Sequence, residues 1–350
     1  MNLNVIDLFA GAGGFSCGLE QAGFNIKVAN EYINAFCNTH RANHKDTIMV
    51  EGDITDPLIK DEIIKNGKKH NCNIIVGGPP CQAYSTAGKR DPFDKRGKLF
   101  LDYFEIVKNI DPEICIMENV KGLLTIKHFP ENISDDLKNK IRKKELSKKE
   151  LDKLKISVLD TIKSKFKALG YNIEHKLLNS ANFGVPQKRE RVILIASKKN
   201  NIQYPIETHS NKDKVNTKKW TTVKNAIDDL KDMNEDIDFS HIFRKYKDKT
   251  TVQRIKDTPC GQSYTGYSEA NFKCYPDKPS NTVKENHGAV FVHYEKNRHM
   301  TPRELARLQS FPDSYVFKGP KGKIFTQLGN AVPPLLAKNI GLAIIEMMKS

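Results

Sequence analysis

Apolar residues gather in short runs along the first third of the chain, and Gly, Pro, Asp or Asn bounds each run. Five runs are nearly continuous in apolar residues, which is typical of strands buried on both faces. They cover residues 4–9, 25–30, 47–52, 73–78 and 113–119. A helical pattern, FSCGLEQAG, follows the first run and ends at a glycine. Strands that alternate with helices predict βαβ units, and therefore an α/β fold with a mostly parallel sheet.

The middle of the chain predicts a long helical segment and two further strands. Residues 132–169 have a helical pattern whose first half is strongly charged, and we interpret that half (132–156) as a solvated insertion. The runs NIEHKLLNSANFG and RVILIAS predict two more strands around a loop.

A change of composition after Ser197 predicts a second unit. Residues 198–300 are polar and rich in Lys, Asn and Thr, with weak periodicity, until a helical pattern returns at PRELARLQSF. The final stretch, PPLLAKNIGLAIIEMMK, predicts a last helix. We therefore expect a larger domain over 1–197 that is completed by 301–350, and a smaller mixed domain over 198–300.

The charge is uneven along the chain. The formal net charge is +15, yet residues 1–124 carry 14 Lys or Arg and 16 Asp or Glu, whereas residues 125–199 carry 19 and nine. A polyanionic partner for the later part of the chain fits this distribution. A general bias toward lysine in the composition would produce the same excess.

The cysteine count and the apolar runs favour a reducing, cytoplasmic location. The seven cysteines are an odd number with no Cys-x-x-Cys pair, which argues against a disulfide framework and a Cys-rich zinc site. We expect no metal. The first apolar run contains Asp7, so it does not suit a signal peptide, and no run of about 18 apolar residues predicts a membrane span.

Two carboxylates accompany a glycine-rich turn between the first strand and the first helix. The turn, DLFAGAGGF, is neither G-x-G-x-x-G nor a phosphate-binding loop ending in Gly-Lys-Ser/Thr. Its glycines let a ligand approach the backbone, and Glu31 and Asp53 end the next two strands. A carboxylate at such a position can hold a ribose diol. Glycine-rich turns also occur for purely structural reasons.

Candidate chemistry follows three later strands. Cys81 comes directly after Pro79-Pro80, and a thiol fixed on such a turn suits a nucleophile. Glu118 ends the next strand and suits a general acid, although a Glu there can also cap a helix. Arg189 and Arg191 lie two apart on an extended segment and face the same side, where they could hold an oxygen; surface arginines are the alternative.

Taken together and in order, these motifs resemble those of the DNA (cytosine-5) methyltransferases of bacterial restriction-modification systems. The motifs are DLFAGAGGFS, GGPPCQAYSTAG, MENVKG, NFGVPQKRERV, TPRELARLQSFPDSY and GNAVPP. The resemblance spans roughly residues 3–124, 170–197 and 276–350. It implies a Rossmann-like S-adenosylmethionine-dependent domain plus a target-recognition domain, here 198–300, and a last helix that packs beside the first.

The resemblance also implies a role for each catalytic candidate. The family methylates C5 of a cytosine flipped out of duplex DNA. Cys81 would attack C6, Glu118 would protonate N3 and Asn119 would brace the cysteine loop. Arg191 would contact the cytosine O2, and Arg189 would support Arg191 and that loop.

The same resemblance assigns the S-adenosylmethionine pocket and a loop that closes over DNA. The pocket residues implied are Phe9, Gly11, Gly13, Gly14, Glu31, Tyr32, Asp53, Ile54, Pro79, Leu99, Asn330 and Val332. The loop residues implied to meet DNA are Gln82, Ser85, Lys89, Arg90 and Arg96. Candidates for DNA contact in the smaller domain are Thr258–Tyr267, Arg244 and Arg254.

Three alternatives remain open at this point. A tRNA cytosine-5 methyltransferase could use the same scaffold, although TPRELARLQSFPDSY and the run after Cys81 favour the DNA enzyme. A catalytically silent DNA-binding module would not need Cys81, Glu118 and Arg191. A nicotinamide-dependent dehydrogenase would need a different glycine pattern. We expect a monomer that acts on double-stranded DNA, a separate cognate restriction endonuclease, and no membrane partner.

Overall fold

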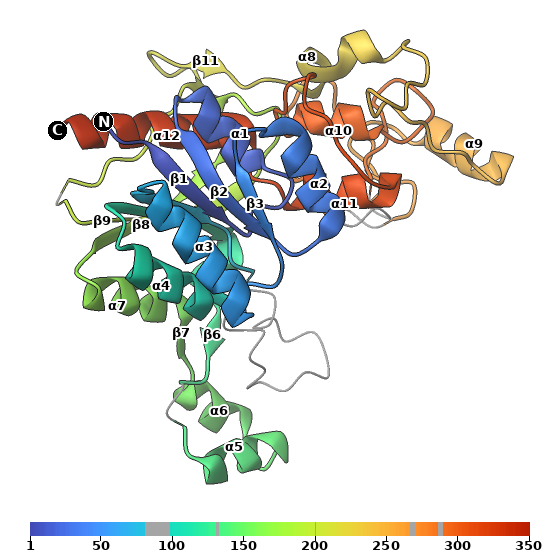
Figure 1. Ribbon diagram of the computed structural model, residues 1–350. Coiled ribbons are helices and arrows are strands. Elements are labelled where there is room, and N and C mark those ends of the chain that lie inside the picture. Colours follow the sequence, from blue (N-terminus) through green and yellow to red (C-terminus); the bar gives the residue numbers. More distant parts are fainter. Residues whose placement is uncertain (81–98, 131–132, 200, 267–269, 286–289) are drawn as a thin grey trace.

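A seven-stranded sheet forms the centre of the molecule (Figure 1). The computed structural model describes residues 1–80, 99–130, 133–199, 201–266, 270–285 and 290–350. The strands of this sheet are β1 (Asn4–Leu8), β2 (Asn25–Glu31), β3 (Ile48–Glu51), β4 (Ile74–Gly77), β5 (Ile114–Val120), β8 (Asn172–Asn179) and β9 (Glu190–Ser197). They stand in the order β3-β2-β1-β4-β5-β9-β8. Strands β1 to β5 are parallel, and β9 is antiparallel to both its neighbours, so the prediction of a mostly parallel sheet is confirmed.

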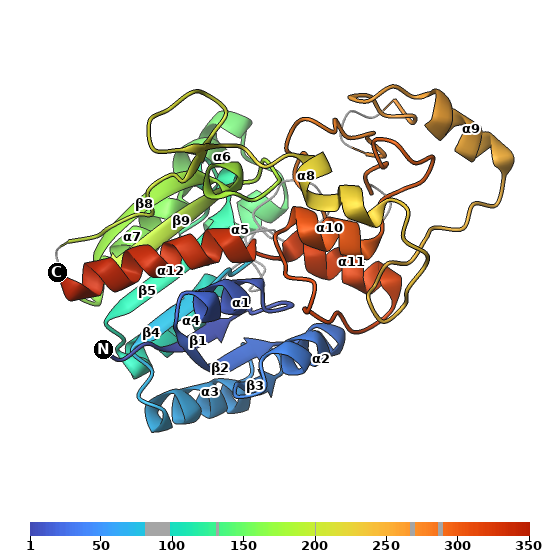
Figure 2. The same cartoon turned by 90° about the horizontal axis from the view of Figure 1, so that it is seen from above.

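Helices cover both faces of this sheet (Figures 1 and 2). They are α1 (Gly14–Gln21), α2 (Asn34–Asn43), α3 (Pro57–Lys69), α4 (Leu99–Ile110), α7 (Val158–Ala168) and α12 (Pro334–Lys349). Helices α3, α4 and α7 share a core with Ile6 and Leu8, whereas α1 and α12 share a core with Val5. Consecutive residues of β1 therefore enter opposite layers, as the two-residue repeat of a strand requires.

The last helix packs beside the first, as the resemblance implied. A Cβ added at Gly18 of α1 would lie 2.2 Å from the carbonyl oxygen of Pro334 and 2.5 Å from Cβ of Ala337. Only glycine permits this approach, because real Cβ atoms do not come so close to a backbone oxygen. Residues from the two ends of the chain thus share one core.

By composition alone, the stretch Lys321–Lys349 is apolar enough to cross a membrane, with a mean hydropathy of 1.3 over its best window. In the fold, 56% of that window is buried. The stretch comprises α11 (Lys321–Asn330) and α12, separated by the non-helical residues 331–333. Its apolar side chains are therefore explained by the core that they fill.

Between Ser197 and α11 the described chain forms little regular structure, and most of it packs at one end of the sheet (Figure 2). Its elements are β10 (His209–Ser210), β11 (Lys218–Lys219), α8 (Val223–Ile227), the 3₁₀ turn η5 (Asp228–Leu230), α9 (Lys249–Asp257) and α10 (Pro302–Leu308). One core joins Val223 and Ile227 of α8 to Leu305 of α10 and to Ala12 of the glycine turn. Helix α8 precedes Thr301 and α10 follows it, yet the two helices share one core, so this core marks no boundary at Thr301. The domain boundary there stays a prediction.

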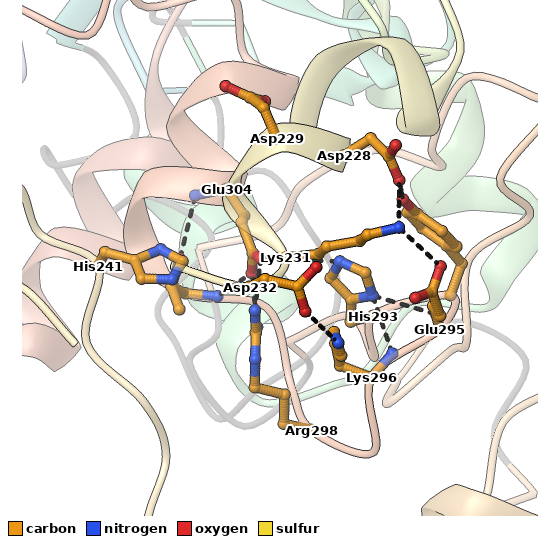
Figure 3. A network of polar contacts seen from close by, with 12 residues as sticks. Asp228, Asp229, Lys231, Asp232, His241, His293, Glu295, Lys296, Arg298 and Glu304 are labelled. Carbon is orange, nitrogen blue, oxygen red and sulfur yellow. Dashed lines mark hydrogen bonds and ion pairs between the residues drawn. The ribbon is translucent and has the colours of Figure 1, made fainter. Parts of the chain in front are cut away.

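A polar network ties the separate parts of this region together (Figure 3). The Nζ of Lys231 lies 3.4 Å from carboxylate oxygens of both Asp228 and Glu295, so it joins η5 to the chain before α10. Both Nη atoms of Arg298 donate to Glu304 of α10, at 2.8 and 2.7 Å. Glu304 is fully buried, and its negative charge is compensated by the Arg298 guanidinium, which donates two hydrogen bonds to the carboxylate.

The charged segment after β5 is a folded arm. Most of its charged side chains are exposed, in keeping with a solvated insertion, and its apolar residues form a small core of their own. Its elements are β6 (Lys127–His128), α5 (Asp135–Arg142), α6 (Lys148–Leu154) and β7 (Ile156–Ser157). Strands β6 and β7 pair as a stem, and the two helices stand away from the main body (Figure 1). The expected helix over 132–169 is thus broken twice, between α5 and α6 and again at β7. Among the described residues of this segment, those of α7 pack on the sheet.

Candidate functional site

The turn after β1 brings backbone N–H groups to the carboxyl edge of the sheet. Phe9, Gly11 and Gly13 all have positive φ values, of 56°, 57° and 84°. A Cβ added at Gly13 would lie 2.6 Å from both His44 Nε2 and Tyr315 Oη, so no larger residue fits there. A Cβ added at Gly11 would meet nothing within 4 Å. The backbone at Gly11 is therefore open to a ligand.

Glu31 accepts three backbone hydrogen bonds, one of them from this turn. Its Oε2 accepts from Gly11 N at 3.0 Å, and its Oε1 accepts from the N–H groups of Tyr32 and Ile33 at 2.9 Å. Burial raises the pKa of Glu31, and the three N–H donors oppose that rise. Each carboxylate oxygen has two acceptor positions. Oε2 therefore keeps one position for a hydroxyl of a ligand, beside the exposed ring of Tyr32.

Asp53 and Ile54, which follow β3, differ in exposure. Asp53 is exposed, and its Oδ1 accepts from the N–H and hydroxyl of Thr55 at 2.9 Å, while Oδ2 accepts no bond from the described part of the chain. Ile54 is only 3% exposed and belongs to the main core. Only the edge of Ile54 is left for a ligand, whereas Asp53 presents a free carboxylate oxygen.

The C-terminal segment closes against the same turn. A Cβ added at Gly14 would lie 2.3 Å from the carbonyl oxygen of Val332. Val332 is 9% exposed, and Asn330 at the end of α11 is exposed. The remaining expected pocket residues also lie near the sheet: Phe9 and Leu99 pack against the main core, and Pro79 is buried.

These residues fit a cofactor that combines a ribose with an aromatic base. The fit rests on the open backbone at Gly11, the remaining acceptor position of Glu31, the free oxygen of Asp53 and the exposed ring of Tyr32. Carboxylates accept well from ribose hydroxyls and amino groups, and an exposed ring offers a stacking face.

The strand end before Cys81 lies against the carboxyl end of β5. The side-chain amide of Asn119 donates to the carbonyl oxygen of Pro79 at 2.8 Å, and both groups are buried. A Cβ added at Gly78 would lie 3.2 Å from Oε2 of Glu118. Cys81 and the expected DNA contacts Gln82, Ser85, Lys89, Arg90 and Arg96 lie outside the described residues.

Glu118 and Arg191 form an ion pair across neighbouring strands. Arg191 Nε lies 2.8 Å from Glu118 Oε1, and the side chains are 12% and 11% exposed. The antiparallel register places Glu118 opposite Ile193 and Val120 opposite Arg191, so the pair is diagonal on one face. A carboxyl group and a guanidinium thus stand side by side within reach of solvent, next to Gly78.

Arg189 serves the packing of the site. It is 1% exposed, and its two Nη atoms donate to the carbonyl oxygens of Val283 at 3.1 Å and Gly329 at 2.9 Å. Burial, assisted by the like charge of Arg191, lowers the pKa of Arg189 to about 9, so the guanidinium is still protonated at neutral pH. The expected support of the cysteine loop involves residues outside the described ones.

The sequence did not reveal two buried polar sets near the site. Gln187 is fully buried; it accepts from Val283 N at 2.8 Å and donates to Leu308 O and to Gln309 Oε1. A second set runs beneath the glycine turn from Asp7 through Ser16, His40 and His44 to Tyr315. A carboxylate inside an otherwise apolar strand was the one available signal, at Asp7.

The two arginines expected to meet DNA in the later region lie on its surface. Arg244 is exposed. Arg254, on α9, donates to the carbonyl oxygen of Tyr264 at 2.7 Å, and its guanidinium lies 5.7 Å from the centre of the Tyr264 ring.

Comparisons with known proteins agree with this geometry. Type II methyltransferase M1.HphI of Haemophilus parahaemolyticus is 34% identical over 363 residues, which cover 99% of this chain and 88% of the relative. Type II methyltransferase M.DdeI of Desulfomicrobium norvegicum is 31% identical over 390 residues, covering 96% and 87%.

Solved structures show the same fold. A protein encoded within an Escherichia coli prophage superposes with a TM-score of 0.73 at 24% identity over the whole of both chains. The Schizosaccharomyces pombe Dnmt2 methyltransferase gives 0.63 at 17% identity over 99% of both chains. At these identities the likeness shows the fold alone. The model of the family described as C-5 cytosine-specific DNA methylase matches residues 3–346, and the chain belongs to that family.

Proposed function

We propose that this DNA cytosine-5 methyltransferase acts through a flipped cytosine and a covalent bond between Cys81 and C6. It would serve as the modification enzyme of a type II restriction-modification system, acting in the cytoplasm. The observation that carries the proposal is the Glu118–Arg191 pair beside Gly78, at the strand end that leads to Cys81. This pair offers a proton donor and a positive charge at one place, as a polarised pyrimidine requires.

The chain's residues divide the work as follows. C5 of cytosine is a poor nucleophile, so the Cys81 thiolate adds to C6 and forms the S–C6 bond while Glu118 protonates N3. The ring becomes an enamine whose C5 can take a methyl group. Arg191 holds O2 and keeps Glu118 oriented, and Asn119 fixes the turn that carries Cys81 through Pro79. After methylation the C5 proton leaves to water, and elimination breaks the S–C6 bond.

S-adenosylmethionine, when bound, supplies a methyl group on a positively charged sulfur. Gly11, Gly13 and Gly14 would line its methionine part. Glu31 would accept from the ribose through Oε2, with Tyr32 beside the adenine and Asp53 at its amino group.

Target choice is proposed to reside in residues 198–300. This region has polar, irregular chain with exposed basic residues such as Arg244, which suits contact with bases and phosphates. Double-stranded DNA is the proposed partner, read by a monomer, and a cognate endonuclease would act separately. Transfer of tritiated methyl groups to duplex DNA and to tRNA would separate this proposal from the RNA alternative, against which the family match speaks.

Trapping with 5-fluorocytosine tests the covalent step. Fluorine at C5 of the target cytosine cannot leave as a proton does, so the enzyme should remain bonded to C6 and migrate with the DNA on a denaturing gel. Cys81→Ser should abolish the trapped band. Cys260→Ser is the matched control, because Cys260 is a half-buried thiol bonded to Tyr294 O and should trap normally. A trapped complex with Cys81→Ser would refute the assignment.

A further inference from the structure

The arm of residues 127–157 has a small core of its own. Phe129, Ile133 and Ile141 are buried, and four leucines pack against them. Ser147 and Glu150 form a capping box at the start of α6. Apart from Ile156, which is exposed, these apolar side chains pack inside the arm, and the surface of α5 and α6 is mostly polar.

The arm begins close to the carboxyl edge of the sheet. Only the 3₁₀ turn η3 (Lys121–Leu124) and two residues separate the end of β5, which carries Glu118 and Asn119, from the stem. The stem is fixed to α7 by a 2.9 Å hydrogen bond between His128 Nε2 and Thr161 Oγ1, and Val158 N donates to Ile126 O. The arm thus projects beyond the carboxyl edge of the sheet, where β5 ends (Figure 1).

The arm carries more positive charge than its own carboxylates neutralise. Residues 138–155 contain nine Lys or Arg and three acids. Lys138, Lys140 and Lys155 are paired with aspartates of the arm. Five other lysines are exposed and have no carboxylate partner in the described part of the chain. These are Lys143, Lys144, Lys148, Lys149 and Lys153.

We propose that these five lysines bind backbone phosphates of duplex DNA that flanks the target cytosine. The inference rests on the proposed function only for its substrate, duplex DNA. Lysine ammonium groups act as point charges that suit phosphates and read no base edges. The arm therefore lengthens the interface on one side of the target without adding to sequence choice.

Three lysines of α6 provide the test. The variant Lys148→Gln, Lys149→Gln, Lys153→Gln removes three positive charges and keeps good helix formers. A matched control removes three exposed lysines from α3, as Lys65→Gln, Lys68→Gln, Lys69→Gln. The end of α3 lies at the amino edge, because the carbonyl oxygen of His70 accepts from the side chain of Asn4 at the start of β1.

The affinity for DNA is measured against salt on duplexes of increasing length, from about 12 to about 40 base pairs, with the flank extended on either side in turn. Each phosphate that the variant no longer binds should make the log–log slope shallower by about 0.9. On long duplexes, the α6 variant should bind roughly tenfold or more weakly at about 50 mM salt. This weakening should appear when one flank alone is extended and vanish on the shortest duplex.

The two proposals fail in different ways. Equal slopes for the native protein, the α6 variant and the α3 control on every duplex would overturn the phosphate-binding arm, while methylation of the short duplex would still stand. A weakening that is the same on short and long duplexes would also overturn it, because damage to the fold does not depend on flank length. Failure of the proposed function would instead abolish methyl transfer to all duplexes by the native protein.

Discussion

Arg191 Nε lies 2.8 Å from Glu118 Oε1, across the antiparallel pair of β5 and β9. The direction of β9 creates this pair, since a parallel strand after β5 would place its entry residues at the opposite edge of the sheet. The two side chains are almost as buried as the core, yet they remain open to a substrate. Their removal should therefore affect chemistry more than cofactor binding.

We expect Glu118→Gln to lower kcat by about 10²–10⁴-fold, because an amide cannot transfer the proton to N3. Affinity for S-adenosylmethionine should hardly change, since Glu118 pairs with Arg191, whereas the expected ligand acceptors Glu31 and Asp53 bond other groups. Single-turnover methyl transfer and calorimetry measure the two quantities. Glu190→Gln is the matched control: Glu190 is an exposed carboxylate paired with Lys121 at 3.0 Å, so its removal should leave the rate within about twofold. A Glu118→Gln enzyme with native kcat would remove Glu118 from the reaction.

The strands around this site could be predicted from the sequence, whereas several contacts could not. The run NIIVGG predicts a buried strand because three apolar residues, Ile74 to Val76, stand between a polar residue and a glycine. The hydrogen bond between Tyr315 and Ala12 O joins residues far apart in sequence, and no local pattern encodes such a contact.

In the arm, a local pattern was present in the sequence, but the charged composition concealed it. Leu137 and Ile141 lie four apart on α5 and are spaced for one helical face, but the lysines around them dominate the composition and conceal the small core that these two residues join. A helical pattern in which apolar residues recur every three or four positions outweighs charge, because the apolar stripe must be buried somewhere.

Replacement of Glu31 and of Asp53 by Ala should have different effects on the stability of the protein. Glu31→Ala should weaken S-adenosylmethionine binding and also lower the stability of the free enzyme by about 1–3 kcal/mol, because three partly buried backbone N–H groups lose their acceptor. Asp53→Ala should weaken cofactor binding by about 1–3 kcal/mol with little effect on stability, since Asp53 is exposed and, among the described residues, its side chain bonds only Thr55. Calorimetry measures the affinity for the cofactor, and urea unfolding measures the stability. If neither variant changed cofactor affinity, the pocket assignment would be wrong.

Asp7 should make stability fall as the pH rises from about 4 to about 7. Burial raises the pKa of Asp7 from 3.8 to about 7, and the Ser16 hydroxyl and the charge of His44 oppose the rise. Between these two values the folded protein holds a proton that the unfolded chain has lost. The free energy of unfolding therefore decreases with pH by up to about 1.4 kcal/mol per unit.

Asp7→Asn should remove this part of the pH dependence, because its amide does not titrate. Urea unfolding of the native protein and the variant at pH 5, 6, 7 and 8 gives the difference, which should narrow or reverse in favour of the variant as the pH rises. Asp61→Asn, at an exposed position, is the control and should run parallel to the native curve. Parallel curves for Asp7→Asn as well would mean that Asp7 is ionised throughout.

Exchange of residues 198–300 should transfer target choice between related enzymes, and the polar network of Figure 3 sets the limits of the exchange. A shorter graft ending near residue 275 would separate Lys231 from Glu295 and Asp232 from Lys296. The whole segment keeps these pairs together. The host must then match the contacts of the segment with α10 and with residues before it, such as Gln187 and Arg189, which bond Val283.

The host should therefore be a type II methyltransferase of known target that carries its own Thr-Pro-Arg-Glu at the start of α10. The Glu of the host can then accept hydrogen bonds from Arg298 of the graft, as Glu304 does here. The Thr of the host can form a hydrogen bond with His241 of the graft, as Thr301 does here. Bisulfite sequencing of DNA from cells that express the chimera should show methylation at this protein's target and none at the host's. A shorter graft over 200–275 should lose thermal stability by comparison. A folded, cofactor-binding chimera that still methylates the host's original sequence would place target choice elsewhere, because the grafted surface would then touch DNA without reading it.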